Sequence, residues 1–187
     1  HGLAKREPKK SRRRKWVRYE RHKANSLWHA DFTDLDGKHL ILFEDDSTRL
    51  IVGYGLFDSE TAQNALQAFA VSIKGFGTPR QLLTDNGSHF CNTHDNTDFK
   101  HAFHGAVTRA GVQHIFTRPS HPQCNGKLEK LNDTIKKLYR YYDGDLMHAV
   151  KMYNEKCLHS SLEWRTPLEV WHAKIAKGLK YEKPIKS

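Results

Sequence analysis

The sequence predicts an α/β fold in which a five-stranded mixed sheet is flanked by helices. Three observations predict it. Short apolar runs separated by turn residues fill positions 28–57, and an apolar period of three to four residues follows at 60–74. Further strand-like runs then alternate with helical segments, which is typical of sheets that contain parallel strands. A chain of 187 residues is long enough for one such domain with peripheral segments.

The first three strands are predicted at residues 28–33, 38–44 and 50–57, with turns at 34–37 and 45–49 between them. Connections this short join antiparallel neighbours, so these strands form a meander. The turns contain four acidic residues, which we interpret as local hydrogen-bonding groups and not as metal ligands. These are Asp34, Asp36, Asp45 and Asp46.

Apolar residues recur every three or four positions from Ala62 to Ile73, which predicts an amphipathic helix over 60–74 that ends at Gly75 and Gly77. A short strand at 80–84 follows. A strand that comes after a helix is expected to return parallel to the sheet.

The remaining elements are predicted as a helix at 98–110, a fifth strand at 112–117, a loop at 118–125, and helices at 127–142, 144–157 and 167–176. The helix at 127–142 has the clearest pattern, because Leu128, Leu131, Ile135 and Leu138 fall on one face. Residues 90–100 are interpreted as a surface loop. Its histidines match no zinc-finger spacing, so zinc binding there is not expected.

Basic residues are concentrated at the start of the chain. Residues 1–23 hold 11 of the 31 Lys and Arg residues but only two of the 21 acidic ones. A basic run beside aromatic residues can neutralise phosphates and stack on bases, so nucleic-acid contact is expected here. A solvated linker or a localisation signal is the alternative. The candidate contacts are Arg12, Arg13, Arg14 and Lys15.

Domain boundaries follow the composition. We expect a basic linker or tail at 1–25, a core at 26–142, a helical extension of the core at 143–176 and a basic tail at 177–187. The chain does not begin with Met and is interpreted as part of a longer protein. Three widely spaced cysteines, no signal peptide and no apolar stretch of membrane-spanning length predict an intracellular protein, cytoplasmic or nuclear, with no membrane partner.

Three carboxylates are placed where a strand or a helix can hold them. Asp31 lies inside the first strand among apolar residues, where an unpaired charge is costly. Asp85 ends the strand at 80–84, and Glu129 falls in the first turn of the helix at 127–142. Each acid alone also has an ordinary interpretation: an outward-facing strand residue, an Asp-Asn-Gly turn, or a charge pair on an exposed helix.

Together and in this order, the segments around these acids resemble the catalytic cores of retroviral integrases and insertion-sequence transposases. The resemblance runs from about Trp28 to Trp171. It includes a trailing pattern of Tyr153-Asn154, His159, Leu162 and Thr166-Pro167. The resemblance implies a ribonuclease-H-like fold, and it implies that Asp31, Asp85 and Glu129 are the catalytic triad. The 43 residues between Asp85 and Glu129 are more than is usual in that family.

Further residues are expected to contact DNA or to support the site. The match to the family suggests Asn86, Gln123, Asn125 and Lys136. Helical spacing places Asn132 or Asp133, Lys136 and Arg140 on the same side as Glu129, where the two basic groups could reach phosphates.

The implied activity is divalent-metal-dependent cleavage of DNA 3′ ends followed by strand transfer. Carboxylates suit Mg²⁺ or Mn²⁺, and two ions are expected when DNA is bound. The expected partners are element ends, target DNA and further copies of the chain. Two alternatives remain: a ribonuclease-H-like nuclease that joins nothing, and an inactive DNA-binding module of the same fold.

Overall fold

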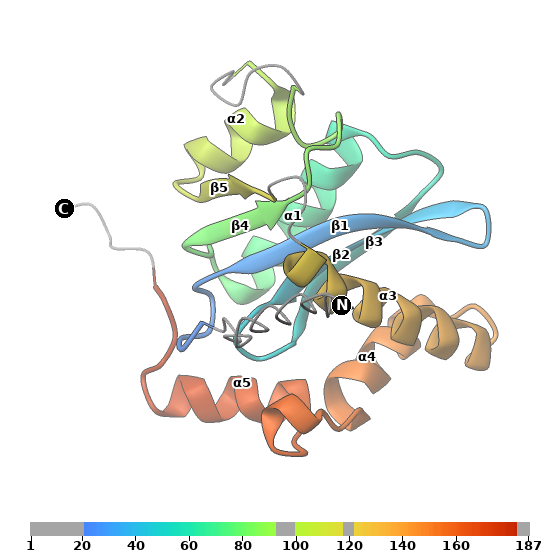
Figure 1. The fold of residues 1–187 in the computed structure, drawn as a ribbon, viewed down its shortest axis with the longest axis vertical. Coiled ribbons are helices and arrows are strands. Elements are labelled where there is room, and N and C mark those ends of the chain that lie inside the picture. The colour runs from blue at the N-terminus through green and yellow to red at the C-terminus, as the bar shows by residue number, and fades with distance from the viewer. Residues whose placement is uncertain (1–20, 93–99, 118–121, 183–187) are drawn as a thin grey trace, which may run out of the picture.

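The computed structural model describes residues 21–92, 100–117 and 122–182, with side chains from 126 onward in the last range. Its centre is one sheet of order β3-β2-β1-β4-β5 (Figure 1). The strands are β1 (Trp28–Leu35), β2 (Lys38–Asp45), β3 (Ile51–Phe57), β4 (Gln81–Thr84) and β5 (Gln113–Phe116). β1, β2 and β3 pair antiparallel, whereas β4 is parallel to both β1 and β5. The predicted five-stranded mixed sheet is confirmed.

Helices cover both faces of the sheet (Figure 1). One face packs against α1 (Ala62–Phe76) and α2 (Ala102–Arg109), and the other against α3 (Pro122–Tyr141) and α4 (Leu146–Lys156). A short 3₁₀ turn, η1 (Ser160–Leu162), leads into α5 (Pro167–Ala176). Within the described residues, no helix combines the length and the apolar character needed to cross a membrane.

The alternation of β1 assigns its side chains to the two faces. Trp28, Ala30 and Phe32 join the apolar cluster under α1, whereas Leu35 joins the cluster under α3. Successive strand residues point to opposite faces, so Asp31 faces the α3 side. The acid of the first strand and the helix that carries Glu129 are therefore on the same side of the sheet.

Several element boundaries differ from the prediction. β1 continues through Asp34, and the turn is only Asp36-Gly37, whose φ angles of 50° and 81° suit a two-residue hairpin. Gly75 lies within α1, which ends one residue before Gly77; the Gly77 N–H donates to the Ile73 carbonyl. α3 begins five residues earlier than expected, at Pro122, because proline is well suited to the first helical position.

The two segments predicted as tails meet beside the core. Ala24 is fully buried and forms an isolated parallel bridge with Lys180. The predicted surface loop at 90–100 is wrong at its start, because Phe90 and Cys91 are buried, and Phe90 packs against Phe103. Burial of a large aromatic side chain contributes to the stability of the core, so Phe90 packs inward.

Thr166 provides a test of how α5 is held. Its hydroxyl accepts the Glu169 backbone N–H, and the Glu169 carboxylate accepts the Thr166 N–H, which completes a capping box. We expect Thr166→Ala to lower the free energy of unfolding by about 1 kcal/mol, because one helix-end donor loses its partner. Urea denaturation measures this, and Thr166→Ser should retain most of the stability. A Thr166→Ala loss below the error of the measurement would contradict this account of the α5 cap.

Candidate active site

Asp31 and Asp85 meet where two parallel strands separate. β1 and β4 pair only at Trp28 with Leu82 and at His29 with Leu83. Two residues later along each chain come Asp31 and Asp85, and both line one small recess. The other residues that line it are His29, Ala30, Leu83, Thr84, Thr117 and Leu128. The carboxyl ends of parallel strands thus bring together the first two predicted acids.

The surroundings of Asp31 penalise its charge. Burial, followed by the negative charge of Asp85, raises the pKa of Asp31 to about 7. Glu60 and Glu129 contribute in the same direction, so three acids lie near enough to Asp31 to raise its pKa. A site that gathers carboxylates in this way is suited to a cation, which would offset their mutual repulsion.

The chain turns sharply after Asp85. Asp85 Oδ1 accepts the Gly87 backbone N–H at 2.9 Å, which is the local turn expected of Asp-Asn-Gly. A Cβ atom at Gly87 would lie 2.5 Å from the His89 ring, so a larger residue there would require this ring to move. Asn86 donates through Nδ2 to the Thr117 carbonyl at 3.0 Å and so joins the end of β4 to the end of β5. The structure therefore shows Asn86 as a link between two strand ends, and its predicted contact with DNA stays a prediction.

Two further residues next to the recess were not identified from the sequence as parts of this site. His89 lies 3.9 Å from Asp85 Oδ1 through Nε2 and 3.8 Å from Glu60 Oε2 through Nδ1. Its ring packs edge-on against Phe32, and burial lowers its pKa. Glu60 in turn contacts His39 at 3.0 Å. Glu60 precedes α1, so no local spacing in the sequence links it to Asp85.

α3 carries the third acid beside the other two. Leu128 lines the recess with Asp31 and Asp85, and Glu129 is the next residue, exposed at the edge of the helix. Because α3 begins at Pro122, Glu129 lies about two turns into the helix and not in its first turn. The structure therefore brings Glu129 near the pair without burying it.

The other candidate residues of α3 have different surroundings. Lys136 is half-buried, and Arg140 is exposed and pairs with Asp36 at 3.1 Å. Asn132 is only 7% exposed, which favours support of the site over direct DNA contact. The side chains of Gln123 and Asn125, and residues 12–15, lie outside the part of the chain that the structure describes. Their DNA contacts stay predictions.

The carboxylates at the recess meet part of what a hard cation requires. Among the described residues, no three His, Cys, Asp or Glu side chains are grouped closely enough to hold one ion. The pair Asp31 and Asp85 still fits Mg²⁺, which usually takes one or two carboxylates and completes its shell with water and substrate phosphate. Glu129 would need to turn inward to join them.

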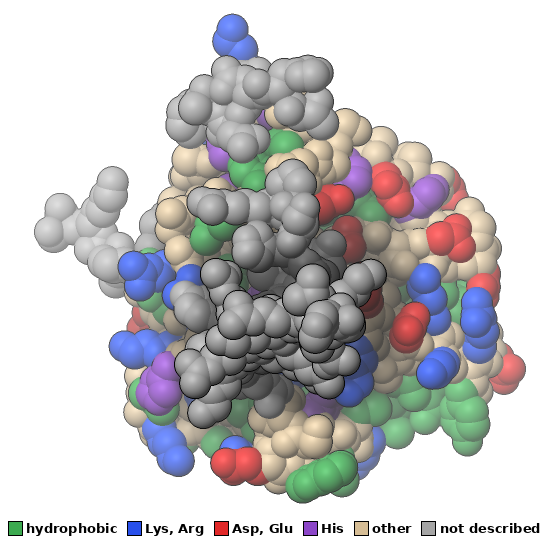
Figure 2. Space-filling view, viewed as in Figure 1, with side chains coloured by type: hydrophobic (Ala, Val, Ile, Leu, Met, Phe, Trp, Pro, Cys, Tyr) green, Lys and Arg blue, Asp and Glu red, His purple; other side chains and the backbone are tan. Residues whose placement is uncertain are grey.

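The surface around the recess is mixed in charge. Figure 2 shows Lys and Arg side chains interspersed with Asp and Glu over the α3 and α4 region, without a single basic stripe. Exposed apolar side chains gather at the tip between these helices, where Tyr141 is 76% and Met147 is 69% exposed. The face seen in Figure 2 therefore does not show the concentrated positive charge that residues 1–23 have in the sequence.

Solved structures of retroviral integrases are similar in shape to this chain, and the three described below are only 20–21% identical to it. The BIV integrase catalytic core matches 82% of this chain and 98% of its own, with a TM-score of 0.67. The magnesium complex of the HTLV-2 integrase core matches 79% and 97%, with a TM-score of 0.64. The match to the simian T-cell lymphotropic virus intasome covers 97% of this chain and 66% of the intasome chain, with a TM-score of 0.71. They show a shared ribonuclease-H-like fold.

Sequence comparison gives the family. A protein of Spiroplasma virus SpV1-C74 that is named for an integrase, ORF3, is 29% identical over 153 residues. That match spans 71% of this chain and 42% of ORF3, so the chain corresponds to less than half of that relative. Two models of the integrase core domain match residues 21–122 and 110–167. With more than half of its length matched by the first of them, the chain belongs to the integrase core domain family.

Proposed function

We propose that this chain catalyses divalent-metal-dependent cleavage of DNA 3′ ends and strand transfer, with Asp31, Asp85 and Glu129 as the catalytic acids. The observation that carries the proposal is the meeting of Asp31 and Asp85 at one recess beside α3, in a chain of the integrase core family. The raised pKa of Asp31 supports it, because a bound cation would favour the ionised carboxylate that burial disfavours.

Each acid would have a distinct part. β1 pairs with β2 on one side and, just before Asp31, with β4 on the other, and the Gly87 N–H holds the Asp85 carboxylate. These two acids would therefore keep a fixed position. Glu129, exposed on α3, would close on the site when DNA arrives. Two Mg²⁺ or Mn²⁺ ions held by these carboxylates would activate water or a DNA 3′-hydroxyl and stabilise the leaving oxygen.

The proposed partners follow from the reaction. Joining requires element ends and target DNA, and pairing two ends requires further copies of the chain; the HTLV-2 core is known in dimeric and trimeric forms. DNA contact is assigned to Lys136 and Arg140 and to the basic segment that contains Arg12, Arg13, Arg14 and Lys15. The protein would act in the nucleoid-containing cytoplasm or in a nucleus.

A strand-transfer assay with a pre-cleaved donor end and supercoiled target tests this proposal. The chain should produce donor–target joints with Mg²⁺ or Mn²⁺ and none with EDTA, and Glu129→Gln should produce none with either ion. Nicked DNA without joints would support the nuclease alternative. If neither joints nor nicks form when metal is added, the result would support an inactive DNA-binding module.

A crystal soaked in Mn²⁺ tests the metal site without reference to activity. We expect anomalous density between Asp31 and Asp85, with Glu129 turned toward it. Density elsewhere, with none between these two carboxylates, would contradict the assignment.

A further inference from the structure

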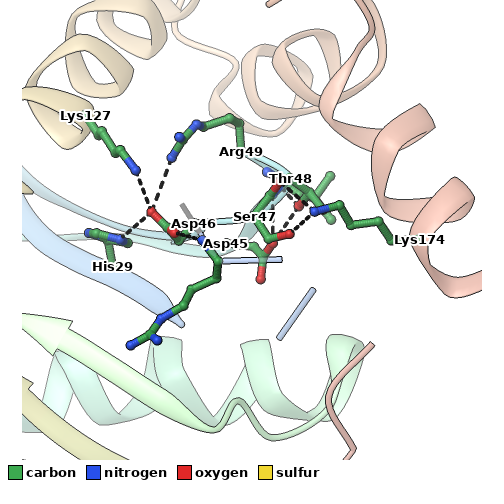
Figure 3. A network of polar contacts seen from close by, with 10 residues as sticks. His29, Asp45, Asp46, Ser47, Thr48, Arg49, Lys127 and Lys174 are labelled. Carbon is green, nitrogen blue, oxygen red and sulfur yellow. Dashed lines mark hydrogen bonds and ion pairs between the residues drawn. The ribbon is translucent and has the colours of Figure 1, made fainter. Parts of the chain in front are cut away.

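Asp46, at the turn between β2 and β3, lies at the centre of a buried polar network. Its side chain is 2% exposed. Asp46 Oδ1 accepts Lys127 Nζ at 2.7 Å, and it lies 3.1 Å from His29 Nε2 and 3.5 Å from Arg49 Nη1. The other oxygen, Oδ2, accepts the Arg21 backbone N–H at 2.8 Å. Figure 3 shows the three side chains converging on this one carboxylate.

The network joins the two elements that carry the acids on the α3 side of the sheet. Lys127 precedes Glu129 by two residues in α3, and His29 precedes Asp31 by two residues in β1. His29 and Asp31 point to the same face, because strand residues alternate. Asp46 therefore connects α3 to the strand of Asp31 within two residues of each acid.

We propose that Asp46 is a positioning residue that, by holding Lys127, sets the rotation of α3 and with it the place of Glu129 beside Asp31. This inference rests on the proposed function. Two residues apart on a helix, Lys127 and Glu129 point in directions roughly 200° apart, with Leu128 between them on the buried side. A contact that fixes Lys127 on one flank of α3 thus directs Glu129 to the other.

The apolar contacts of α3 do not provide this directionality. Leu128, Leu131 and Ile135 pack on the sheet, but hydrophobic contact is non-directional and tolerates small rotations of a helix. A hydrogen-bonded ion pair has a preferred geometry. A buried ion pair is also a weak source of stability compared with apolar packing, so we assign the pair of Asp46 and Lys127 to orientation.

The first test uses the metal dependence of strand transfer. Lys127→Met and the milder Lys127→Gln should raise the Mg²⁺ concentration needed for half-maximal activity by roughly 10-fold to 100-fold, as loss of a supporting contact does at metal sites. Lys127→Arg, which keeps a charged donor, should restore most of the wild-type value. Lys137→Met, on the exposed side of the same helix, is the matched control and should leave the half-maximal concentration unchanged.

The second test measures hydrogen exchange in α3 and does not depend on enzymatic activity. In Lys127→Met and Asp46→Asn, backbone amides of 127–135 should exchange with deuterium roughly tenfold faster, while those of α5 should not change. Unchanged exchange in α3 would overturn the inference even if the wild-type chain joins DNA. A lower melting temperature with an unchanged Mg²⁺ requirement would also overturn it, since the network would then be only structural. If the wild-type chain joins no DNA, the proposed function fails, and the exchange result still decides whether Asp46 holds α3.

Discussion

Asp85→Asn is expected to abolish metal-dependent strand transfer, by roughly a thousandfold or more in rate, while DNA affinity changes little. Asn retains the shape and one oxygen, so the turn that Asp85 makes with the Gly87 N–H can persist. It lacks the negative charge that a hard cation requires of its ligands. The effect should therefore fall on chemistry and not on folding or on phosphate contacts made elsewhere.

Donor–target joints and DNA binding should be measured on the same preparation. Asp58→Asn is the matched control, because its carboxylate is 91% exposed and only pairs weakly with Lys38 at 3.6 Å. It should transfer strands at the wild-type rate. Strand transfer by Asp85→Asn within a few-fold of the wild type would remove Asp85 from the catalytic acids.

Asp31→Asn is expected to stabilise the metal-free protein at alkaline pH although it removes activity. The pKa of Asp31 is raised from 3.8 to about 7, chiefly by burial. Below pH 3.8 the carboxyl group is mostly neutral in both the folded and the unfolded chain, so it does not lower the free energy of unfolding. As the pH rises toward 7 the unfolded chain loses this proton first, and the folded state becomes progressively less stable. Asn cannot ionise and avoids this loss.

At pH 8 the gain should be about 2 kcal/mol in the free energy of unfolding, a figure reduced for the partial exposure of the side chain, and near pH 3.5 it should vanish. Chemical denaturation across this range measures it, with Asp34→Asn on the exposed part of β1 as the control. Mg²⁺ should raise the melting temperature of the wild type but not of Asp31→Asn. An equal gain at both pH values would contradict the assigned cause.

Local patterns were enough to predict the sheet, whereas the grouping of the acids was predicted from the resemblance to a known family. Alternating burial in β1 and the helical period that includes Leu128 and Ile135 are properties of consecutive residues, so they can be read directly. The start of α3 could not be read in this way. Residues 123–126 are Gln-Cys-Asn-Gly, a composition that is typical of a loop, whereas α3 begins already at Pro122, a residue suited to the first helical position.

Contacts between distant segments account for the rest of what the sequence did not reveal. Asp46 was interpreted as an ordinary turn residue, but its partner Lys127 is 81 positions away. His89, in the segment after β4, and Glu60, just before α1, come together although 29 positions separate them. No spacing rule applies to such pairs, since the intervening chain has no fixed length. Asp31, by contrast, could be predicted as unusual, because a carboxylate among apolar strand residues needs a compensating partner.

The departure of β4 from β1 gives the site a mechanical consequence. Beyond His29, β1 continues to Leu35 with β2 as its only strand neighbour among the described residues, and β2 pairs in turn with β3. Asp31 therefore lies on the outer strand of a three-stranded antiparallel sheet, two residues after the pairing with β4 ends. The tip of the β1–β2 hairpin is tied to the far half of α3 by the pair of Asp36 and Arg140. A displacement of this tip would thus move Arg140 with it, whereas Asp31 is held by its pairing with β2 and by the nearby pairing with β4.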